Sequence, residues 1–467
     1  MDKQIYCRNF SVITKRDRQV LNNNNLNPSF HVQTIHLLMY KKDPLCHRRK
    51  FRTFASMNMK PTLYFTPLSF PIYVMAKPAG ALCNMDCEYC YYLEKSGLYQ
   101  ERKQNRMSDE TLERFTQAYI ECQTSPFVQF TWHGGESLLR GLDFYRKALK
   151  FQRQYGQGRE IQNCIQTNGL LLNDEWCRFF KDNDFLVGIS IDGPEAMHDR
   201  YRKDCGGRGT FTRVMRGIER LHRHGVEFNT LSVLHDYNVR FPLEMYHFFK
   251  DIGSRYMQFS PIVERLGTRA DGLELLTAAD HPDDCEPAPW SVDPIAYGDF
   301  YIAVFDEWVR HDVGQYYIQL FDATLAGVLG QPPGVCIYAK TCGHALAMEY
   351  NGDVYACDHF VYPEYRRGNL YEKTLVEMTL SDEQRRFGND KRDGLPAECR
   401  SCHFLEWCNG ECPKNRIAVS SDGEYGLNYL CAGLKRYFAH VEPAMAFMAE
   451  ELRNGRPPAN IMHEIRR

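Results

Sequence analysis

From about residue 70, short runs of apolar residues alternate with longer stretches in which apolar residues recur every three or four positions. The short runs predict buried strands and the longer stretches predict amphipathic helices. Strands are expected at 71–77, 127–132, 161–166, 185–191, 226–234 and 255–263. Helices are expected near 108–122, 141–155, 173–181 and 210–224, and between the last two strands. This alternation favours an α/β fold, a parallel sheet in an open or closed β/α barrel, with functional loops at the C-terminal ends of the strands.

The pattern changes further along the chain. Residues 265–292 contain Gly, Pro, Asp and Glu without clear periodicity, and we expect a surface insertion there. Helical stretches follow near 294–311 and 318–329, and from Pro332 cysteines, glycines and short segments prevail. The expected organisation is therefore a β/α domain over 70–331, a cysteine-rich domain over 332–440 and a C-terminal helix or tail over 441–467.

The first 58 residues have a different composition from the rest. They contain 11 Lys or Arg against three Asp or Glu, and an asparagine run at 22–25. Their basic patches lack helical or strand periodicity. We interpret 1–58 as a disordered basic extension or as sequence that precedes a true start near Met57 or Met59. A functional basic tail is the remaining alternative.

Composition and charge exclude several classes of protein. The chain has 467 residues, 43% of them hydrophobic, and a net charge of −2, so no overall basic field argues for nucleic acid or a membrane. We find neither a secretory signal nor an apolar run long enough for a membrane span. A reducing cytoplasm is expected, and there the 18 cysteines favour metal binding over disulfides.

Three cysteines directly after the first predicted strand carry the strongest signal. Cys83, Cys87 and Cys90 have the spacing C-x3-C-x2-C. Three thiolates can hold three irons of a 4Fe–4S cluster and leave the fourth iron open to a small molecule, whereas closed sites use four protein ligands. This loop, with Tyr89 just before its last cysteine, resembles that of the radical S-adenosylmethionine (SAM) enzymes.

Further motifs fall at the ends of later predicted strands. Gly134, Gly135 and Glu136 follow the second strand, where paired glycines let a ligand approach the backbone closely. The motifs at 166–169 and 190–194 are either simple turns or turns that face a ligand. Arg202 is either a carboxylate-binding residue or a solvated surface arginine.

The C-terminal region contains eight more cysteines in a dense arrangement. They are Cys336, Cys342, Cys357, Cys399, Cys402, Cys408, Cys412 and Cys431. Eight thiolates are enough for two complete 4Fe–4S clusters. Zinc is the alternative, because C-x2-C spacing commonly binds it. Zinc sites alone would not explain the upstream loop at 83–90.

Together these motifs resemble the anaerobic sulfatase-maturating enzymes, radical SAM proteins with a C-terminal SPASM domain. The resemblance runs from about Pro71 to about His440. It implies that the first three cysteines hold a SAM-binding cluster. It also implies that SAM is contacted by Tyr89, Gly134, Gly135, Glu136, Ser190, Arg202 and Val263. The eight late cysteines would hold two auxiliary clusters in a crossed arrangement, Cys336, Cys342, Cys357 and Cys412 for one and Cys399, Cys402, Cys408 and Cys431 for the other.

The resemblance also implies a reaction. A 5′-deoxyadenosyl radical would take a hydrogen atom from Cβ of a cysteine or serine in a C/S-x-P-x-R segment of a sulfatase, yielding Cα-formylglycine. Asp358 would be the catalytic base, unless it only orients Cys357. An electron would leave toward an auxiliary cluster, and flavodoxin or ferredoxin would serve as the low-potential donor. Glu264 is a less well matched candidate for the base.

Two departures and two alternatives remain. His133 and Ser137 stand where many relatives have glutamine and proline, and His133 either contacts substrate or only packs. One alternative function is a SPASM enzyme that cross-links a ribosomal peptide. The other is a non-catalytic iron–sulfur electron carrier, which the open coordination site and the glycine pair disfavour.

Overall fold

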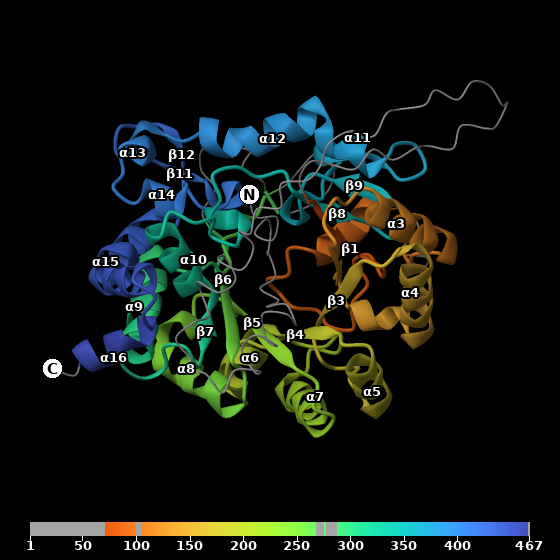
Figure 1. Cartoon of the computed structure of the whole chain (residues 1–467), viewed down its shortest axis with the longest axis horizontal. Coiled ribbons are helices and arrows are strands. Elements are labelled where there is room, and N and C mark those ends of the chain that lie inside the picture. Colours follow the sequence, from red (N-terminus) through yellow and green to blue (C-terminus); the bar gives the residue numbers. More distant parts are fainter. Residues whose placement is uncertain (1–70, 100–104, 268–274, 277–286, 466–467) are drawn as a thin grey trace.

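The central element of the protein is a ten-stranded sheet. The computed structural model describes residues 71–99, 105–267, 275–276 and 287–465, and the strand order is β10-β9-β8-β1-β2-β3-β4-β5-β6-β7. The strands are β1 Tyr73–Ala76, β2 Phe127–Trp132, β3 Glu160–Thr167, β4 Leu186–Ser190, β5 Phe228–Leu234, β6 Tyr256–Pro261, β7 Tyr317–Ile318, β8 Ala345–Met348, β9 Asp353–Tyr355 and β10 Arg366–Asn369. Strands β1 to β7 are parallel and form an arc (Figure 1). In the described residues β7 and β10 do not pair, which confirms an open β/α barrel.

Helices cover the outer side of this arc (Figure 1). They are α3 Asp109–Glu121, α4 Leu142–Tyr155, α5 Asp174–Asp182, α6 Glu195–Tyr201, α7 Phe211–Arg223, α8 Pro242–Asp251, α9 Pro294–His311 and α10 Gln319–Val328. Side-chain caps define the starts of α3 and α5 as the sequence predicts. Ser108 Oγ accepts from Thr111 N at 3.0 Å before α3, and Asn173 Oδ1 accepts from Trp176 N at 2.9 Å before α5.

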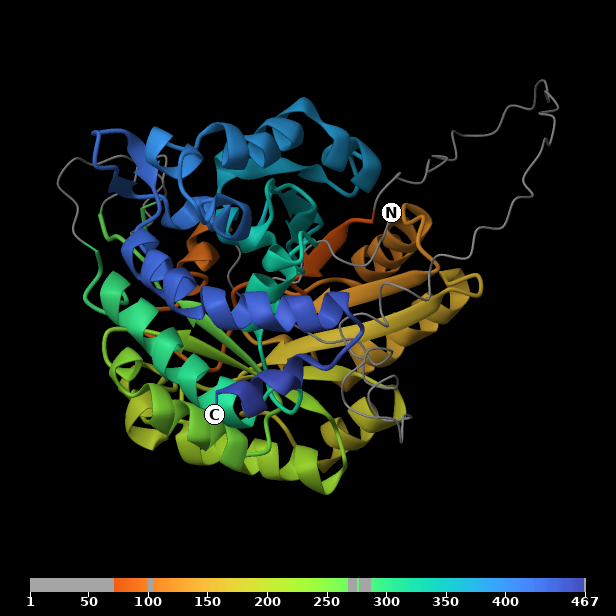
Figure 2. The same ribbon diagram turned by 60° about the vertical axis from the view of Figure 1, so that its left-hand side comes forward.

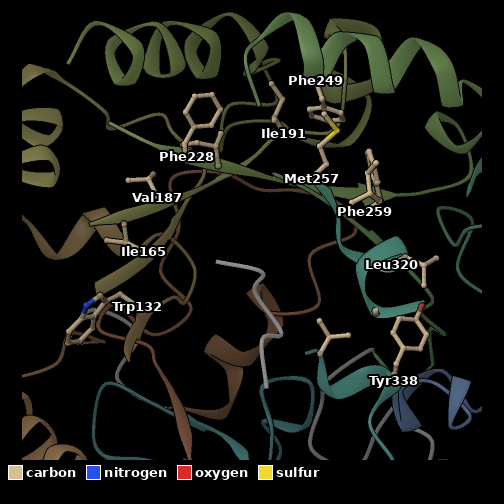
Figure 3. Close-up of a cluster of buried hydrophobic side chains, with 14 of the residues drawn as sticks. Trp132, Ile165, Val187, Ile191, Phe228, Phe249, Met257, Phe259, Leu320 and Tyr338 are labelled. Carbon is tan, nitrogen blue, oxygen red and sulfur yellow. The ribbon is translucent and has the colours of Figure 1, made fainter. Parts of the chain in front are cut away.

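The core lies between the strands and the outer helices (Figure 3). Val187 of β4 and Met257 of β6 are almost completely buried there. Phe249 of α8 packs against Phe259 of β6 with ring centroids 5.6 Å apart. Burial of the strands on this side explains the apolar residues that each strand contains, because helices cover parallel sheets.

The cysteine-rich region extends the same sheet. β8 pairs in parallel with β1, in register from Tyr73 opposite Ala345 to Ala76 opposite Met348, and β9 and β10 follow antiparallel. The boundary expected at residue 332 therefore lies within a continuous sheet. The remaining elements are α11 Leu375–Leu380, α12 Asp382–Asp393, α13 Ala397–Arg400, α14 Leu405–Cys408, β11 Ala418–Val419, β12 Tyr425–Leu427, α15 Cys431–Arg453 and α16 Ile461–Glu464.

Helix α15 crosses α9 at very short range (Figure 2). A methyl group at Gly433 would lie 1.8 Å from Pro294 O, and one at Gly298 would lie 2.3 Å from Gly433 O. Only glycine permits this approach, which ties the C-terminal helix to the barrel. None of the helices in the described ranges is long and apolar enough to cross a membrane. The expected extension at 1–58 and most of the expected insertion at 265–292 lie outside the described residues.

Candidate active site

A cavity of about 250 Å³ opens at the C-terminal ends of the strands. The loop after β1 contributes Cys83, Cys87, Tyr89 and Cys90 to its wall. The ends of β2 to β6 contribute further residues, among them Gly134, Gly135, Gln166, Ser190, Ser232 and Gln258. On the side of the cysteine-rich region the wall is completed by Asp358, His359, Glu411, Cys412 and Lys414. The motifs that are scattered over 330 residues of sequence thus meet in one place.

The cysteine loop is held by backbone contacts rather than by disulfides. Cys83, Cys87 and Cys90 are free thiols, and Cys90 N donates to Cys87 O at 2.9 Å. Asp86 N donates to Lys203 O at 2.9 Å, which ties the loop to the segment after α6. Three thiols on the wall of one cavity are the donor set that a 4Fe–4S cluster with an open iron requires.

The glycine turn after β2 is locked onto this loop. Gly134 has a φ of +133°, and a methyl group on Gly135 would lie 2.2 Å from Leu82 O. Gly135 N donates to Gly80 O, and Glu136 N donates to Leu82 O, both at 2.8 Å. The amides are therefore occupied, so the carbonyl oxygens of the turn are the groups that can accept from the ammonium of an amino acid.

Glu136 lies behind the cavity wall rather than on it. Its side chain is completely buried and accepts from Leu138 N, Thr167 Oγ1 and Asn168 N at 2.8 to 2.9 Å. Burial raises the pKa of this carboxyl group to about 7, although the three donors act in the opposite direction. Glu136 joins the glycine turn to the turn at 167–168. Among the expected SAM contacts it is therefore a residue that stabilises the cavity wall from behind.

Asp192 connects two of the expected SAM contacts, and the sequence analysis did not single it out. Arg202 Nε lies 2.8 Å from Asp192 Oδ2, and Tyr89 OH donates to the same oxygen at 2.5 Å. Burial alone would raise the pKa of Asp192, but the charge of Arg202 holds it below its usual value. Arg202 is 8% exposed and is therefore not a solvated surface residue. Gln166 Nε2 donates to Ser190 Oγ at 2.8 Å on the same wall.

Near the end of β6, the residue on the cavity wall is the neighbour of the expected SAM contact Val263. Ile262 lines the cavity, whereas Val263 packs in the hydrophobic core and is not part of the cavity wall. Lys414 Nζ donates to Val263 O and forms an ion pair with Glu264 Oε1, both at 2.6 Å. On the described cavity wall, Ser232 Oγ is buried and has no hydrogen-bond partner, so a polar ligand can bind there.

Asp358 lines the same cavity, at the start of a short 3₁₀ turn, Asp358–Phe360. It forms an ion pair with Lys77, and Tyr91 OH donates to its Oδ2 at 2.5 Å. Burial alone would raise the pKa of Asp358, but the charge of Lys77 keeps it well below its usual value, so the group is a carboxylate. Lys77, at the end of β1, was missed by the sequence analysis because nothing in its local pattern separates it from a surface lysine.

His133 also lines the cavity, directly before the glycine turn. Its Nδ1 lies 3.4 Å from Lys77 Nζ. Burial, together with the charge of Lys77, lowers the pKa of His133 to about 3, so its imidazole is neutral. Burial likewise lowers the pKa of His359 to about 4, with Lys414 acting in the same direction.

The structure divides the eight late cysteines into two groups of four. Cys357 lies near Cys336, Cys342 and Cys412, whose charges would act together with burial to raise the pKa of its thiol. A separate cavity of about 20 Å³ is lined by Cys399, Cys402, Cys408 and Cys431. All eight thiols are free. Each group supplies the four thiolates that a complete 4Fe–4S cluster needs, and their crossed order along the chain is the one that the resemblance implies.

Comparison with known proteins identifies the family. Residues 79–249 match the radical SAM superfamily, and residues 340–403 match an iron–sulfur cluster-binding domain, SPASM. The chain is 55% identical over 408 residues to a serine-type anaerobic sulfatase-maturating enzyme of Bacteroides thetaiotaomicron, covering 87% of this chain and 98% of that protein. The chain belongs to the anaerobic sulfatase-maturating enzymes. A serine-type enzyme of Klebsiella aerogenes is 36% identical over 79% of this chain and 85% of its own.

A solved structure of the family supports the same assignment. The structure of anSMEcpe with bound AdoMet and Cp18Cys peptide matches with a TM-score of 0.71 and 29% identity, over 82% of this chain and 99% of that one. The protein is therefore a radical SAM enzyme that uses S-adenosylmethionine and iron–sulfur clusters. These matches remove the zinc and electron-carrier alternatives, because both domains of a radical SAM enzyme are present.

Proposed function

We propose that this enzyme oxidises a serine of a sulfatase polypeptide to Cα-formylglycine, with Asp358 as the catalytic base. One observation carries the proposal: the cysteine loop, the glycine turn and the Asp358 carboxylate all line a single cavity. The target is assigned as serine because the relatives at 55% and 36% identity are named serine-type, whereas the solved enzyme with a cysteine peptide is 29% identical.

The residues of the chain would divide the work among cluster binding, SAM binding and proton transfer. Cys83, Cys87 and Cys90 would hold one cluster, and the two groups of late cysteines would hold two more. When bound, these clusters and SAM supply a 5′-deoxyadenosyl radical that removes a hydrogen atom from the serine Cβ, and an acceptor for one electron. Ser190, the carbonyls of the glycine turn and the Tyr89–Asp192–Arg202 group would bind and orient SAM.

Asp358 would take the hydroxyl proton of the substrate. The O–H bond breaks, its proton passes to the carboxylate, and the C=O bond of formylglycine forms as the electron leaves. A base must be ionised before it can accept, and Lys77 keeps the Asp358 carboxylate ionised despite its burial. The imidazole of His133 is neutral, so it adds no second positive charge beside the Asp358 carboxylate.

We further propose the cellular partners and compartment. The polypeptide substrate would present a serine in an S-x-P-x-R segment. A flavodoxin or ferredoxin would deliver the reducing electron at low potential. The reaction would take place in the cytoplasm, because clusters held by free thiolates need a reducing compartment.

The proposal is tested by anaerobic reconstitution of the full chain with iron, sulfide, dithionite and SAM. Two peptides that differ only in S-x-P-x-R against C-x-P-x-R are compared by mass spectrometry and by reaction of the aldehyde with a hydrazine probe. We expect the serine peptide to lose two hydrogen atoms and gain an aldehyde. Oxidation of the cysteine peptide alone would overturn the serine assignment, and no aldehyde from either peptide would overturn the function.

A further inference from the structure

Lys77 is a completely buried lysine that lies behind the cavity wall, in contact with the wall residue Asp358. It follows β1, and its backbone N–H donates to Met348 O at 2.8 Å, which fixes its position on the neighbouring strand β8. Burial of an ammonium group is costly unless a negative charge compensates it. The compensating charge in direct contact with its ammonium is Asp358.

The two oxygens of the Asp358 carboxylate have different partners. Lys77 contacts Oδ1, and Tyr91 OH donates to Oδ2 at 2.5 Å. Lys77 is in turn held by the ring of Tyr92, whose centroid lies 4.0 Å from Nζ, and by His133 Nδ1 at 3.4 Å. A carboxylate held at both oxygens cannot rotate freely, so its orientation toward the cavity is set by these side chains.

We propose that Lys77 is a positioning residue for the oxidation step, and that with Tyr91 it holds Asp358 in the orientation that accepts the substrate proton. The inference rests on the proposed function and deepens it. Asp358 follows Cys357 on a short turn, and its backbone alone leaves the side-chain torsions free. Proton transfer requires the accepting oxygen within hydrogen-bond reach of the hydroxyl, so the loss of Lys77 misplaces the base without removing it.

The same chain contains a matched group of residues far from the cavity wall. Asp312 Oδ2 lies 2.7 Å from Lys250 Nζ and accepts from Tyr246 OH at 2.8 Å. This Lys–Asp–Tyr group joins α8 to the end of α9, and none of its members lines the cavity. It therefore provides control substitutions of the same chemistry with no part in the proposed proton transfer.

The test compares Lys77→Met, Lys77→Arg and Tyr91→Phe with the control Lys250→Met in the full chain with its clusters assembled. The readout is the amount of formylglycine formed per 5′-deoxyadenosine, beside the rate of 5′-deoxyadenosine release. A misplacement of about 1 Å can cost roughly 100-fold, so we expect the ratio to fall about 10-fold to 100-fold in Lys77→Met while SAM cleavage continues. Lys77→Arg should restore part of the ratio, and Lys250→Met should leave it unchanged.

A double variant distinguishes positioning from an independent role. Lys77→Met combined with Asp358→Asn should have the same ratio as Asp358→Asn alone, because Lys77 acts only through that carboxylate. An unchanged ratio in Lys77→Met, or a further fall in the double variant, would overturn the inference. If Lys77→Met fails to assemble its clusters, Tyr91→Phe becomes the deciding variant. An unchanged ratio of formylglycine to 5′-deoxyadenosine in Tyr91→Phe would then overturn the inference. A wild-type enzyme that makes no formylglycine contradicts the proposed function itself.

Discussion

At the scale of single residues, the cavity depends on charged side chains whose partners lie elsewhere in the sequence. Asp358 is separated by 281 positions from Lys77, and Asp192 lies ten positions before Arg202. The sequence predicted Asp358 and Arg202 because motifs mark them. It did not predict Lys77 or Asp192, because a buried partner shows no local signature in composition or periodicity. Glu136 was placed among the SAM contacts by its motif, and its burial was not visible from the motif.

The assignment of the base is tested by Asp358→Asn. The amide keeps the size of the side chain but cannot accept the hydroxyl proton, so we expect formylglycine formation to fall by about 100-fold or more, the usual contribution of a general base. The clusters and release of 5′-deoxyadenosine should remain, measured by absorbance and chromatography. Glu264→Gln is the rival substitution. If it abolishes the product while Asp358→Asn does not, Glu264 is the base.

The buried carboxyl group of Glu349 predicts a dependence of stability on pH. Burial raises its pKa to about 7, above the unfolded value of about 4.3. The unfolded chain releases the proton first, so this contribution to stability is complete below about pH 4 and is lost as the pH rises through 7.

Glu349→Gln should therefore flatten the pH profile. Between pH 6 and 7 each unit costs the wild type at most about 1.4 kcal/mol through this group. We expect the anaerobic thermal midpoint to decline less steeply with pH in Glu349→Gln than in the wild type. Glu110→Gln, on the exposed side of α3, controls for the change in net charge. Equal slopes in the wild type and Glu349→Gln would contradict the linkage.

At the scale of elements, strands β1 to β6 and most of their helices were predicted closely, whereas β7 and α6 were not predicted. The strand at 127–132 and the capped helix after Ser108 have the expected limits, because an apolar run and a cap are local signals. Strand β8 was not predicted. It is four residues long and lies among glycines and cysteines, so its pairing with β1 depends on the tertiary fold.

The contact between the glycine turn and the cysteine loop predicts the effect of Gly135→Ala. The added methyl group would meet the backbone of Leu82 and Ala81, which cannot move without displacing the loop. We expect the affinity for SAM to fall at least about tenfold, or 1.4 kcal/mol, in equilibrium binding. Gly158→Ala strains the backbone at a φ of +80° but leaves open space around its added methyl group, so it controls for a general loss of stability. Unchanged SAM affinity in Gly135→Ala would show that the turn does not shape the site.

At the scale of the whole molecule, one continuous sheet supports both the cysteine loop and the segment that contains Asp358. β1 leads into the cysteine loop and Lys77, and its neighbour β8 leads through β9 to Cys357 and Asp358. The start and the end of the proposed oxidation are therefore adjacent in space although the sequence separates them. The sequence predicted two units divided at residue 332, because composition changes there, and composition cannot reveal a sheet that crosses the division.

The most direct test of the account follows the hydrogen atom itself. The serine peptide is synthesised with deuterium in place of both hydrogen atoms on Cβ. It is incubated anaerobically with the reconstituted full chain, SAM and reductant. The account predicts 5′-deoxyadenosine that contains one deuterium and a formylglycine aldehyde that retains the other, both measured by mass spectrometry. Unlabelled 5′-deoxyadenosine, or an unmodified serine beside labelled 5′-deoxyadenosine, would contradict oxidation at Cβ.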